Sequence, residues 1–174
     1  MPSPAVRRAS GADVPALLAL IHSAYRGESS RAGWTHEADL IDGSRIDEGL
    51  LRADLADPST TFCVAEDEAG LLACCAVVDR GAGTAYFGTF AVRPTAQARG
   101  IGDALLAHAE AAARSLGATR MEMTVIARRA DLIAWYLRRG YAPTGETRPF
   151  PYGDERFGVP RVPDLEFTVL AKSL

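Results

Sequence analysis

The sequence predicts an α/β fold in a single domain that covers residues 1–174. Segments with strand spacing alternate with segments with helical spacing along the chain. Three strand-like runs follow one another between residues 60 and 92, which is the pattern of an antiparallel meander. The third run leads through a glycine-containing turn into a helix rich in Ala and Leu. No internal repeat or shift in composition divides the chain, and its length is sufficient for one substantial core.

The N-terminal half is predicted to contribute a strand, two helices and the meander. Helical spacing is clear in Val14, Leu17 and Ile21, and the second helix must end before Pro58, because proline cannot continue a helix. The turn at residues 67–70 joins the first two strands of the meander. The predicted elements of this half are strand 5–10, helix 12–25, helix 46–55, and strands 60–66, 71–79 and 84–92.

The C-terminal half is predicted to return to the sheet three times. Met121, Met123 and Val125 alternate with polar residues, as in a strand with one buried face. Gly117 and Gly140 each suit the left-handed position that ends a helix. The predicted elements of this half are helix 101–116, strand 119–127, a helix containing Tyr136, strand 141–147, a loop rich in proline and aromatic residues at 149–163, and strand 165–171.

Composition restricts the class of protein. Hydrophobic residues make up 48% of the chain and the mean hydropathy is −0.01, as in globular proteins. No segment approaches the roughly 18 uninterrupted apolar residues of a membrane helix, and residues 1–4 open no apolar signal segment. We therefore expect a cytoplasmic protein that does not bind membranes. The formal net charge of −3 argues against nucleic acid as the main partner.

The cysteines and histidines predict neither a disulfide framework nor a metal site. Cys63, Cys74 and Cys75 all lie in apolar strand-like segments, where cysteine behaves as a small hydrophobic residue. The three histidines are scattered without the spacing of metal ligands. We expect no bound metal.

The most informative segment is the turn from Val92 to Gly102. Two glycines at a helix start let backbone N–H groups approach a ligand closely, and the free amides and positive end of the helix dipole attract phosphate oxygens. A Walker loop requires Gly-Lys-Ser/Thr, which is absent, and the dinucleotide fingerprint requires glycine where Leu105 stands. The turn predicts a carrier of pyrophosphate of another kind, with an ordinary strand-to-helix turn as the alternative.

Two motifs together resemble one family. The spacing Gln97-x-x-Gly100-x-Gly102 is similar to the Q/R-x-x-G-x-G/A signature of the GNAT superfamily, the acyl-CoA-dependent N-acyltransferases. The later segment 131–141 resembles the A-x-x-L-Y-x-x-x-G-F element of the same superfamily and places Tyr136 on a helix. The resemblance is specific over residues 84–145 and follows the order of elements elsewhere.

The resemblance implies the GNAT fold, a central mixed, mostly antiparallel sheet of about six to seven strands flanked by about four helices. Two parallel central strands, 84–92 and 119–127, would splay apart around a bulge and admit the pantetheine arm of acetyl-CoA. The backbone of Phe90, Ala91 and Val92 would pair with that arm. The pyrophosphate would be held by the backbone amides of Gln97, Ala98, Arg99, Gly100, Ile101, Gly102 and Asp103.

The activity implied is the transfer of an acetyl group from acetyl-CoA to a primary amine, by direct attack through a tetrahedral intermediate. Tyr136 would protonate the departing thiolate, because a phenol with a pKa of about 10 keeps its proton at pH 7. A backbone N–H at Val92 would stabilise the oxyanion. The alternative for Tyr136 is a core tyrosine.

The sequence departs from the family pattern at two positions. Several relatives carry a glutamate as general base eleven residues before the Gln/Arg position, where this chain has Tyr86. An asparagine usually stands seven residues before the helix tyrosine, and here it is Arg129. This residue is interpreted as a solvated loop arginine, with an extra cation near the edge of the cofactor as the alternative. The candidates for a base elsewhere are Glu28, Glu37, Asp39 and Glu122.

Two segments are candidates for binding the acceptor. Residues 25–40 and 150–157 combine aromatic, hydroxyl and carboxylate side chains, which suit a cationic amine through cation–π contacts and ion pairs. The alternative is that Thr35 begins a capped helix and that 149–163 packs as a lid. The predicted acceptor-binding residues are Glu28, Trp34, Thr35, Glu37, Asp39 and Tyr152.

Three functions therefore remain open after the sequence analysis. A small-molecule amine acetyltransferase is favoured, because Tyr136 is present and 149–163 suggests a closing lid. The others are a protein N-acetyltransferase and a non-catalytic CoA-binding module. The sequence leaves open the acceptor, the preferred acyl chain and the oligomeric state, a homodimer included.

Overall fold

A seven-stranded sheet forms the centre of the structure, a computed structural model that describes residues 4–174. Its strands are β1 (Ala5–Arg8), β3 (Thr60–Asp67), β4 (Gly70–Asp79), β5 (Thr84–Val92), β6 (Arg120–Ile126), β7 (Ala142–Pro149) and β9 (Glu166–Ser173). They lie in the order β1-β3-β4-β5-β6-β9-β7. Every neighbouring pair is antiparallel except β5 and β6, which run parallel. The predicted mixed, mostly antiparallel sheet is confirmed.

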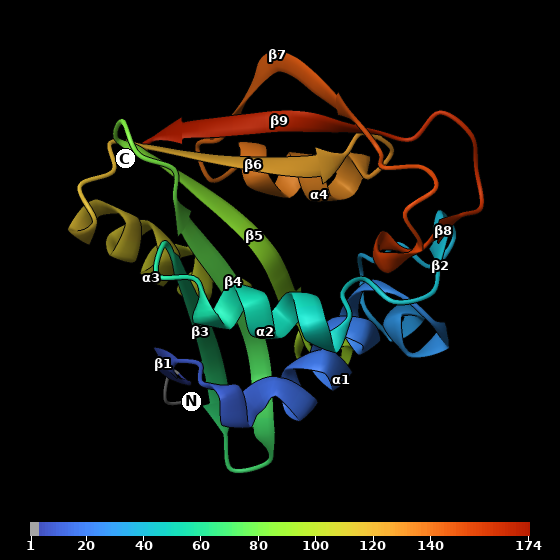
Figure 1. Cartoon of the computed structure of the whole chain (residues 1–174), viewed down its shortest axis with the longest axis horizontal. Coiled ribbons are helices and arrows are strands. Elements are labelled where there is room, and N and C mark those ends of the chain that lie inside the picture. The colour runs from blue at the N-terminus through green and yellow to red at the C-terminus, as the bar shows by residue number, and fades with distance from the viewer. Residues whose placement is uncertain (1–3) are drawn as a thin grey trace.

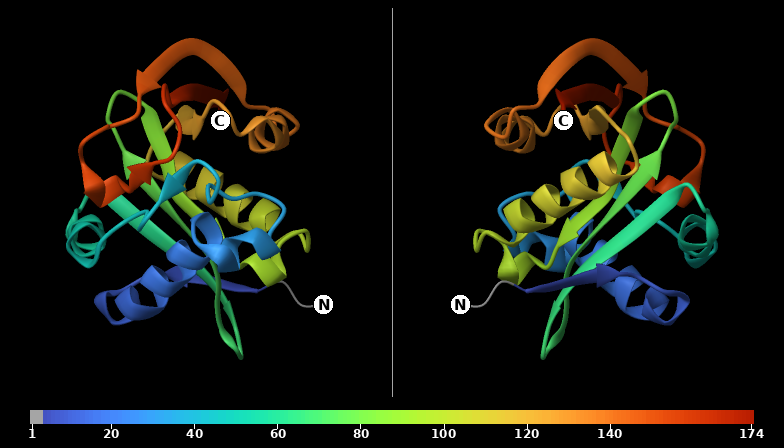
Figure 2. Two further views of the ribbon diagram at one scale, coloured as in Figure 1. Left: turned by 90° about the vertical axis from the view of Figure 1, so that its right-hand side faces the viewer. Right: turned by 90° about the vertical axis from the view of Figure 1, so that its left-hand side faces the viewer.

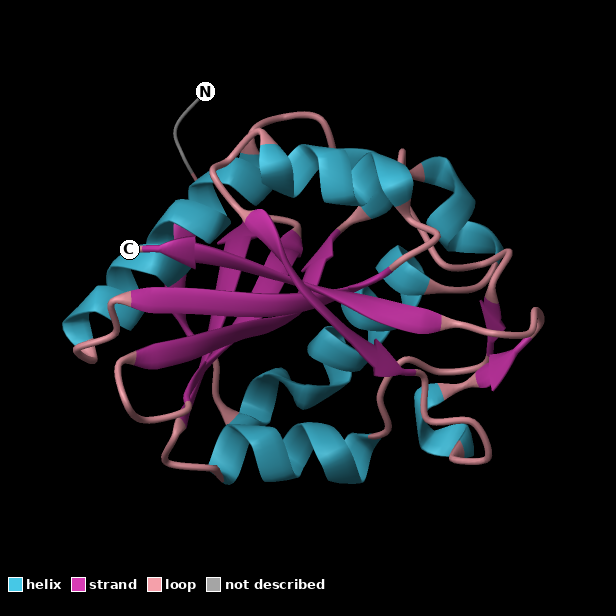
Figure 3. Ribbon diagram, turned by 90° about the horizontal axis from the view of Figure 1, so that it is seen from above, coloured by secondary structure: helices cyan, strands magenta, loops and turns pink. Residues whose placement is uncertain are grey.

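Four α-helices of the described chain cover the sheet: α1 (Val14–Tyr25), α2 (Glu48–Ala56), α3 (Ile101–Ser115) and α4 (Ala130–Leu137). Helices α1 and α2 pack on one face, and α3 and α4 pack on the other (Figures 1 and 3). Within residues 4–174, none of these helices combines the length and apolar character needed to cross a lipid bilayer.

The central strands bury both of their faces. On β3 and β4, Cys63 and Cys75 pack into the cluster under α3, whereas Phe62 and Cys74 pack into the cluster under α1. Because both faces are covered, β4 has a continuous run of buried residues rather than an alternation of buried and exposed ones. The cysteines are buried free thiols in these clusters, as the apolar character of their segments predicted.

The helices and strands of the sheet lie where the sequence predicted them, with ends that differ by at most two residues. A second, two-stranded sheet was not predicted: β2 (Ile41–Asp42) pairs with β8 (Val159–Pro160) and ties the loop after α1 to the loop after β7. The alternative of a helix capped at Thr35 is wrong. The next helix, α2, is capped by Asp47, whose Oδ1 accepts a hydrogen bond from the amide of Leu50 (2.7 Å).

The parallel strands β5 and β6 pair only where they begin. Residues 84–86 lie opposite 120–122, and beyond this point the two strands separate. Strands β6, β9 and β7 cross the top of the molecule while β3, β4 and β5 descend from it (Figures 1 and 2). A bulge accompanies the separation, because Thr89 and Phe90 on β5 stand opposite Cys75 alone. The predicted splaying of this pair is confirmed.

Candidate functional site

The end of β5 turns polar backbone groups toward the gap between β5 and β6. The amide of Arg93 donates to the carbonyl of Leu72 (2.7 Å), so the adjacent pair Val92 and Ala73 belongs to the non-hydrogen-bonded sites of the antiparallel ladder. The N–H and C=O of Val92 therefore point away from β4, into a region where β6 no longer pairs with β5. The Val92 carbonyl accepts a hydrogen bond from Gln97 Nε2 (3.2 Å), which leaves the Val92 N–H as the donor that faces the gap.

The bulge in β5 is strained. Thr89 has a φ of +45°, a left-handed conformation that is rare for a β-branched residue. The carbonyl of the next residue, Phe90, accepts a hydrogen bond from the Tyr25 hydroxyl (2.6 Å), which fixes α1 against the bulge. Burial raises the pKa of Tyr25 to about 12, so this phenol keeps its proton and stays a donor.

The turn after β5 requires its two glycines for different reasons. Gly100 precedes α3 with a φ of +77°, which glycine adopts without strain. A Cβ at Gly102 would lie 3.3 Å from Phe90 Cζ and 3.6 Å from Trp135 Cζ2. The glycines thus leave space beside the N-terminus of α3, where the first amides have no partners within the helix. This is the geometry of an anion-binding turn.

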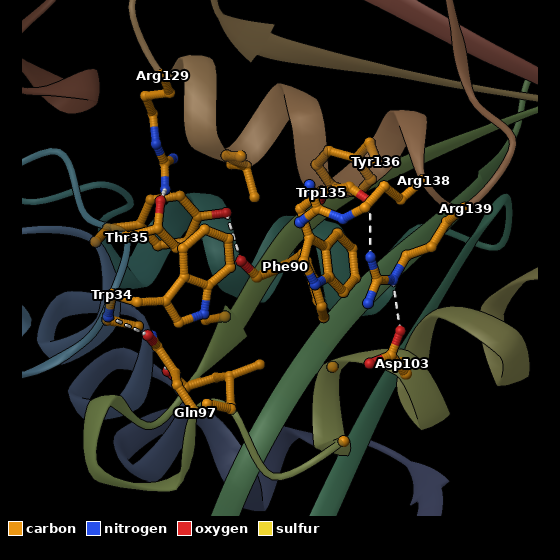
Figure 4. Close-up of a pocket in the computed structure, with 18 residues that line it drawn as sticks. Trp34, Thr35, Phe90, Gln97, Asp103, Arg129, Trp135, Tyr136, Arg138 and Arg139 are labelled. Carbon is orange, nitrogen blue, oxygen red and sulfur yellow. Dashed lines mark hydrogen bonds and ion pairs between the residues drawn. The ribbon is translucent and has the colours of Figure 1, made fainter.

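A cavity of about 400 Å³, the first cavity, opens between this turn, the end of β5 and α4 (Figure 4). The predicted cofactor residues that line it are Phe90, Ala91, Val92, Gln97, Ala98, Gly100, Gly102 and Asp103. Arg99 and Ile101 do not line it: Arg99 is exposed and Ile101 is buried in the core. Their predicted contribution is restricted to backbone amides.

Gln97 has a structural role that the sequence did not indicate. Its Oε1 accepts a hydrogen bond from the amide of Trp34 (2.9 Å) while its Nε2 donates to Val92 (Figure 4). A Cβ at Gly33 would lie 2.5 Å from that same Oε1. The side chain therefore fastens the loop after α1 to the end of β5 and places Trp34 on the wall of the first cavity.

Three residues near the end of α4 line the first cavity but were not among the predicted cofactor residues. The guanidinium of Arg139 stacks 3.6 Å from the centroid of the Trp135 ring and forms an ion pair with Asp103 at the start of α3 (Figure 4). Arg138 lines the same cavity. These two cations could have been found from their position within the segment 131–141, because α4 brings them opposite the glycine turn.

A cavity of about 240 Å³, the second cavity, lies in the gap between β5 and β6. Its apolar wall includes Phe150 and Phe157, from the loop after β7. The hydroxyls of Tyr86 and Thr124 lie 2.7 Å apart on its polar side. The two cavities share five lining residues, so they meet beside α4: Tyr25, Phe90, Arg129, Leu132 and Tyr136.

Tyr136 lies at the junction of the two cavities. The residue is 4% exposed, and among residues 4–174 its hydroxyl forms no hydrogen bond. Burial raises the pKa of Tyr136 well above its usual value, and the charge of Arg129 opposes that rise. The phenol therefore holds its proton at neutral pH and could give it only to a strong base, such as a thiolate formed in the same buried site.

Glu37 and Arg129 form an ion pair in the wall of the second cavity. Arg129 Nη1 lies 3.0 Å from Glu37 Oε1, and Arg26 Nη2 lies 3.2 Å from Glu37 Oε2. The side chain of Arg129 is 10% exposed and also donates from Nη2 to Thr35 Oγ1 (2.9 Å). The interpretation of Arg129 as a solvated loop arginine is therefore wrong: it is a buried cation shared by both cavities.

The remaining predicted acceptor residues divide into two groups. Trp34 and Thr35 line the first cavity, and Glu37 lines the second. Glu28 and Asp39 line neither cavity, because Arg31 pairs with both at the surface.

Tyr152 is also outside both cavities. Its hydroxyl donates to the carbonyl of Val162 (3.0 Å) and accepts from the amide of Leu165 (2.8 Å), so it fastens its own loop. Its neighbour Phe150 lines the second cavity instead. Glu122, the other candidate base, pairs with Arg120 (3.0 Å) and lines neither cavity. Among the described residues, no three His, Cys, Asp or Glu side chains gather as metal ligands would.

Solved structures with the same architecture include several acetyltransferases. The ribosomal-protein-S18-alanine N-acetyltransferase from Escherichia coli has a TM-score of 0.72 and 17% identity, over 98% of this chain and 93% of that one. The IAA acetyltransferase from Bacillus cereus has a TM-score of 0.69 and 18% identity, over 99% and 100%. A GNAT family acetyltransferase from Elizabethkingia anophelis, with acetyl-CoA bound, has a TM-score of 0.68 and 16% identity, over 100% of both chains. At these identities the likeness establishes the fold.

The sequence itself gives the family. No curated protein matches the chain. The model of the acetyltransferase (GNAT) family matches residues 19–141, which include the glycine turn before α3, the splayed strands and Tyr136. With the fold in agreement, this chain belongs to the GNAT acetyltransferase family.

Proposed function

We propose that this protein transfers an acetyl group from acetyl-CoA to the primary amine of a small molecule. The observation that carries the proposal is the meeting of two cavities at Phe90 and Tyr136. One cavity borders an anion-binding turn, and the other occupies the gap between two splayed strands. A donor and an acceptor bound on the two sides would face each other at a buried phenol.

The residues of the first cavity fit acetyl-CoA. Gly100 and Gly102 leave the N-terminus of α3 accessible to phosphate oxygens. Arg138 adds positive charge at the opposite wall, where Arg139 pairs with Asp103. Trp135 offers an apolar surface beside them. Acetyl-CoA, when bound, supplies an acetyl group activated as a thioester.

Two groups of the chain are placed to assist the transfer. In the proposed reaction, the amine nitrogen bonds to the acetyl carbon to give a tetrahedral intermediate, and the carbon–sulfur bond breaks when that intermediate collapses. The N–H of Val92 donates to the acetyl oxygen as negative charge develops there. Tyr136 gives its proton to the sulfur and recovers one from the acetylated amine through solvent.

The second cavity favours a small acceptor over a peptide. Its volume of about 240 Å³ is below the range of about 300–1,000 Å³ typical of pockets for drug-sized ligands. The loop carrying Phe150 and Phe157 closes one side, and the β2–β8 sheet holds that loop in place. An extended peptide would require a groove open at both ends.

A dedicated carboxylate base is not part of the proposal. Glu37 is the one carboxylate among the described residues that line the second cavity, and arginines bind both of its oxygens. Tyr86 stands where several relatives carry a glutamate, and it offers a neutral hydroxyl. We propose that the amine reacts in its neutral form after losing a proton to water.

The test combines binding with turnover. Acetyl-CoA is expected to raise the melting temperature, and a panel of small primary amines is expected to contain an acceptor that releases CoA thiol. The absence of any thermal shift would refute the proposal. A shift without turnover on any amine or peptide would instead indicate a CoA-binding module, and turnover on peptide N-termini alone would indicate a protein acetyltransferase.

A further inference from the structure

The charges around the second cavity are not balanced. Three arginines line it, and one carboxylate opposes them: Arg26, Arg45, Arg129 and Glu37. An acid-rich site would suit a simple cationic amine, as the sequence analysis expected, but this wall carries a net positive charge. Burying charge without a counter-charge is costly, so such a wall calls for an anion in the ligand.

Arg26 is not the group that would bind this anion. Its side chain is 2% exposed, and its Nη1 donates to the carbonyls of Ser44 and Phe157 (both 2.6 Å). Its Nε and Nη2 both face Glu37 Oε2. These donors are therefore committed to holding the loops together, and Glu37 is the counter-charge of this arginine.

Arg45 and Arg129 are different because they keep unused donors. Among residues 4–174, Arg45 forms no hydrogen bond or ion pair, although it is half-buried and lies 5.5 Å from the centroid of the Tyr25 ring. Arg129 lies 5.8 Å from the same ring. Its Nε is buried and without a hydrogen-bond partner in the described chain. Tyr25 thus lies near two guanidinium groups. Glu37 pairs with Arg129, whereas the carboxylate nearest in effect to Arg45, Asp54, attracts it without forming an ion pair and does not line the cavity.

From this arrangement we infer that the acceptor carries an acid group as well as its amine. The inference rests on the proposed function and specifies its substrate class: a small amine with a carboxylate or phosphonate bound by Arg45 beside Arg129. Guanidinium groups bind either anion with paired, charge-assisted hydrogen bonds. Phe150, Phe157 and Phe167 would contact an apolar side chain of the same molecule. An apolar amino acid has all three parts.

The same charges favour the reactive form of the amine. A positive wall disfavours an ammonium group close to it, because like charges raise the free energy of the protonated form. The acid group of the acceptor would supply the attraction that draws the molecule into the site. This division of roles is consistent with a cavity that has no unpaired carboxylate among its described residues.

The experiment compares matched acceptors. Release of CoA thiol is measured with the common L-amino acids, their carboxamides, their decarboxylated amines and their aminophosphonate analogues, at saturating acetyl-CoA. The acid-bearing member of an apolar pair is expected to have a kcat/KM at least about tenfold above that of its carboxamide. The carboxylate and phosphonate arms identify which anion is preferred.

Arg45→Gln is expected to raise the KM of the acid-bearing acceptor by about tenfold or more, with little change for the carboxamide or for the KM of acetyl-CoA. Arg45→Lys is expected to have a KM for the acid-bearing acceptor between those of the parent and Arg45→Gln, because lysine keeps the charge without the forked geometry of the guanidinium. Arg52→Gln is the matched control: it removes one positive charge from an exposed arginine on α2 that lines neither cavity. It should change none of these constants.

Two results would overturn the inference. One is a carboxamide or simple amine that reacts as well as its acid-bearing partner, which would leave the proposed function intact. The other is an Arg45→Gln variant whose KM rises equally for the acid-bearing acceptor and for its carboxamide. If acetyl-CoA binds but no amine of the panel is acetylated, the proposed function fails first, and the inference fails with it.

Discussion

Glu37 and Arg129, 92 positions apart in the sequence, form an ion pair of 3.0 Å at the place where the two cavities meet. Arg26 pairs with the other oxygen of the same carboxylate. The loop after α1, the start of α4 and the loop after β7 therefore converge on one buried charge. The stability of the fold and the shape of the candidate site depend on the same residues.

Glu37→Gln is expected to destabilise the protein strongly. The substitution leaves Arg26, which is 2% exposed, without its counter-charge, and breaking a buried pair from one side costs about 3–5 kcal/mol. Urea unfolding measures the loss. Arg129→Gln is the comparison, and its loss should be smaller, because Glu37 keeps Arg26. Equal stability of Glu37→Gln and the parent would contradict this account of the pair.

Tyr136→Phe is expected to slow turnover by at least about a hundredfold, the usual contribution of a positioned acid. Stability should change by less than about 0.5 kcal/mol, because within the described chain the lost hydroxyl has no hydrogen-bond partner to leave unpaired. The Kd of acetyl-CoA should stay the same. Stopped-flow detection of CoA thiol with an identified acceptor measures the effect. Unchanged turnover would assign Tyr136 to the core alone.

Gly102→Ala separates binding from folding. The added methyl group would lie 3.3 Å from Phe90 and fill part of the first cavity, so acetyl-CoA affinity should fall by about tenfold. Alanine favours a helix over glycine by up to about 1 kcal/mol, so the free protein should be as stable as the parent or more so. Calorimetric titration measures the affinity for acetyl-CoA, and thermal unfolding measures the stability of the free protein. Unchanged affinity would exclude this turn from the binding site.

Gly100 tests the charge of the same turn. Gly100→Ala strains a left-handed position by about 1 kcal/mol, whereas Gly100→Glu adds the same strain and an anion beside the proposed phosphate site. Acetyl-CoA should still raise the melting temperature of the alanine variant and should not raise that of the glutamate variant. An equal thermal shift in both variants would argue against an anion at this helix start.

A pH dependence of stability is expected from Asp13. Hydrogen bonds from Arg7 (2.8 and 3.0 Å) lower the pKa of Asp13 from 3.8 to about 2. Because the folded value lies below the unfolded one, the carboxylate stabilises the fold above about pH 4, and the contribution is lost as the pH falls toward 2. The difference in the free energy of unfolding between the parent and Asp13→Asn should shrink over that range, and added salt should reduce it.

Glu68→Gln, in the exposed turn between β3 and β4, is the control for this pH effect, because Glu68 has no ion pair among the described residues. The free energy of unfolding of Glu68→Gln should differ little from that of the parent across the same pH range. A difference for Asp13→Asn that does not vary between pH 5 and pH 2 would show that the Arg7 contact does not persist in solution.

The sequence alone predicted the helices and strands, and it identified the glycine turn and Tyr136 as the candidate donor side of the site. Helix and strand spacing are local properties, so the ends of the predicted elements lie within two residues of those observed. The glycines at 100 and 102 act through local backbone geometry, so their spacing was enough to predict a turn that leaves the N-terminus of α3 accessible. Tyr136 was found by its place in a helix motif.

The charges of the candidate acceptor side were decided by the tertiary structure, because charge pairing joins residues far apart in the chain. Glu28 and Asp39 had the right chemistry, but Arg31 holds them at the surface. The sequence alone suggested that Arg129 is a loop arginine, and the fold places it against Glu37. The charges of the second cavity come from Arg26 and Glu37 after α1, from Arg45 before α2 and from Arg129 at the start of α4. Only the packing of these segments brings the charges together.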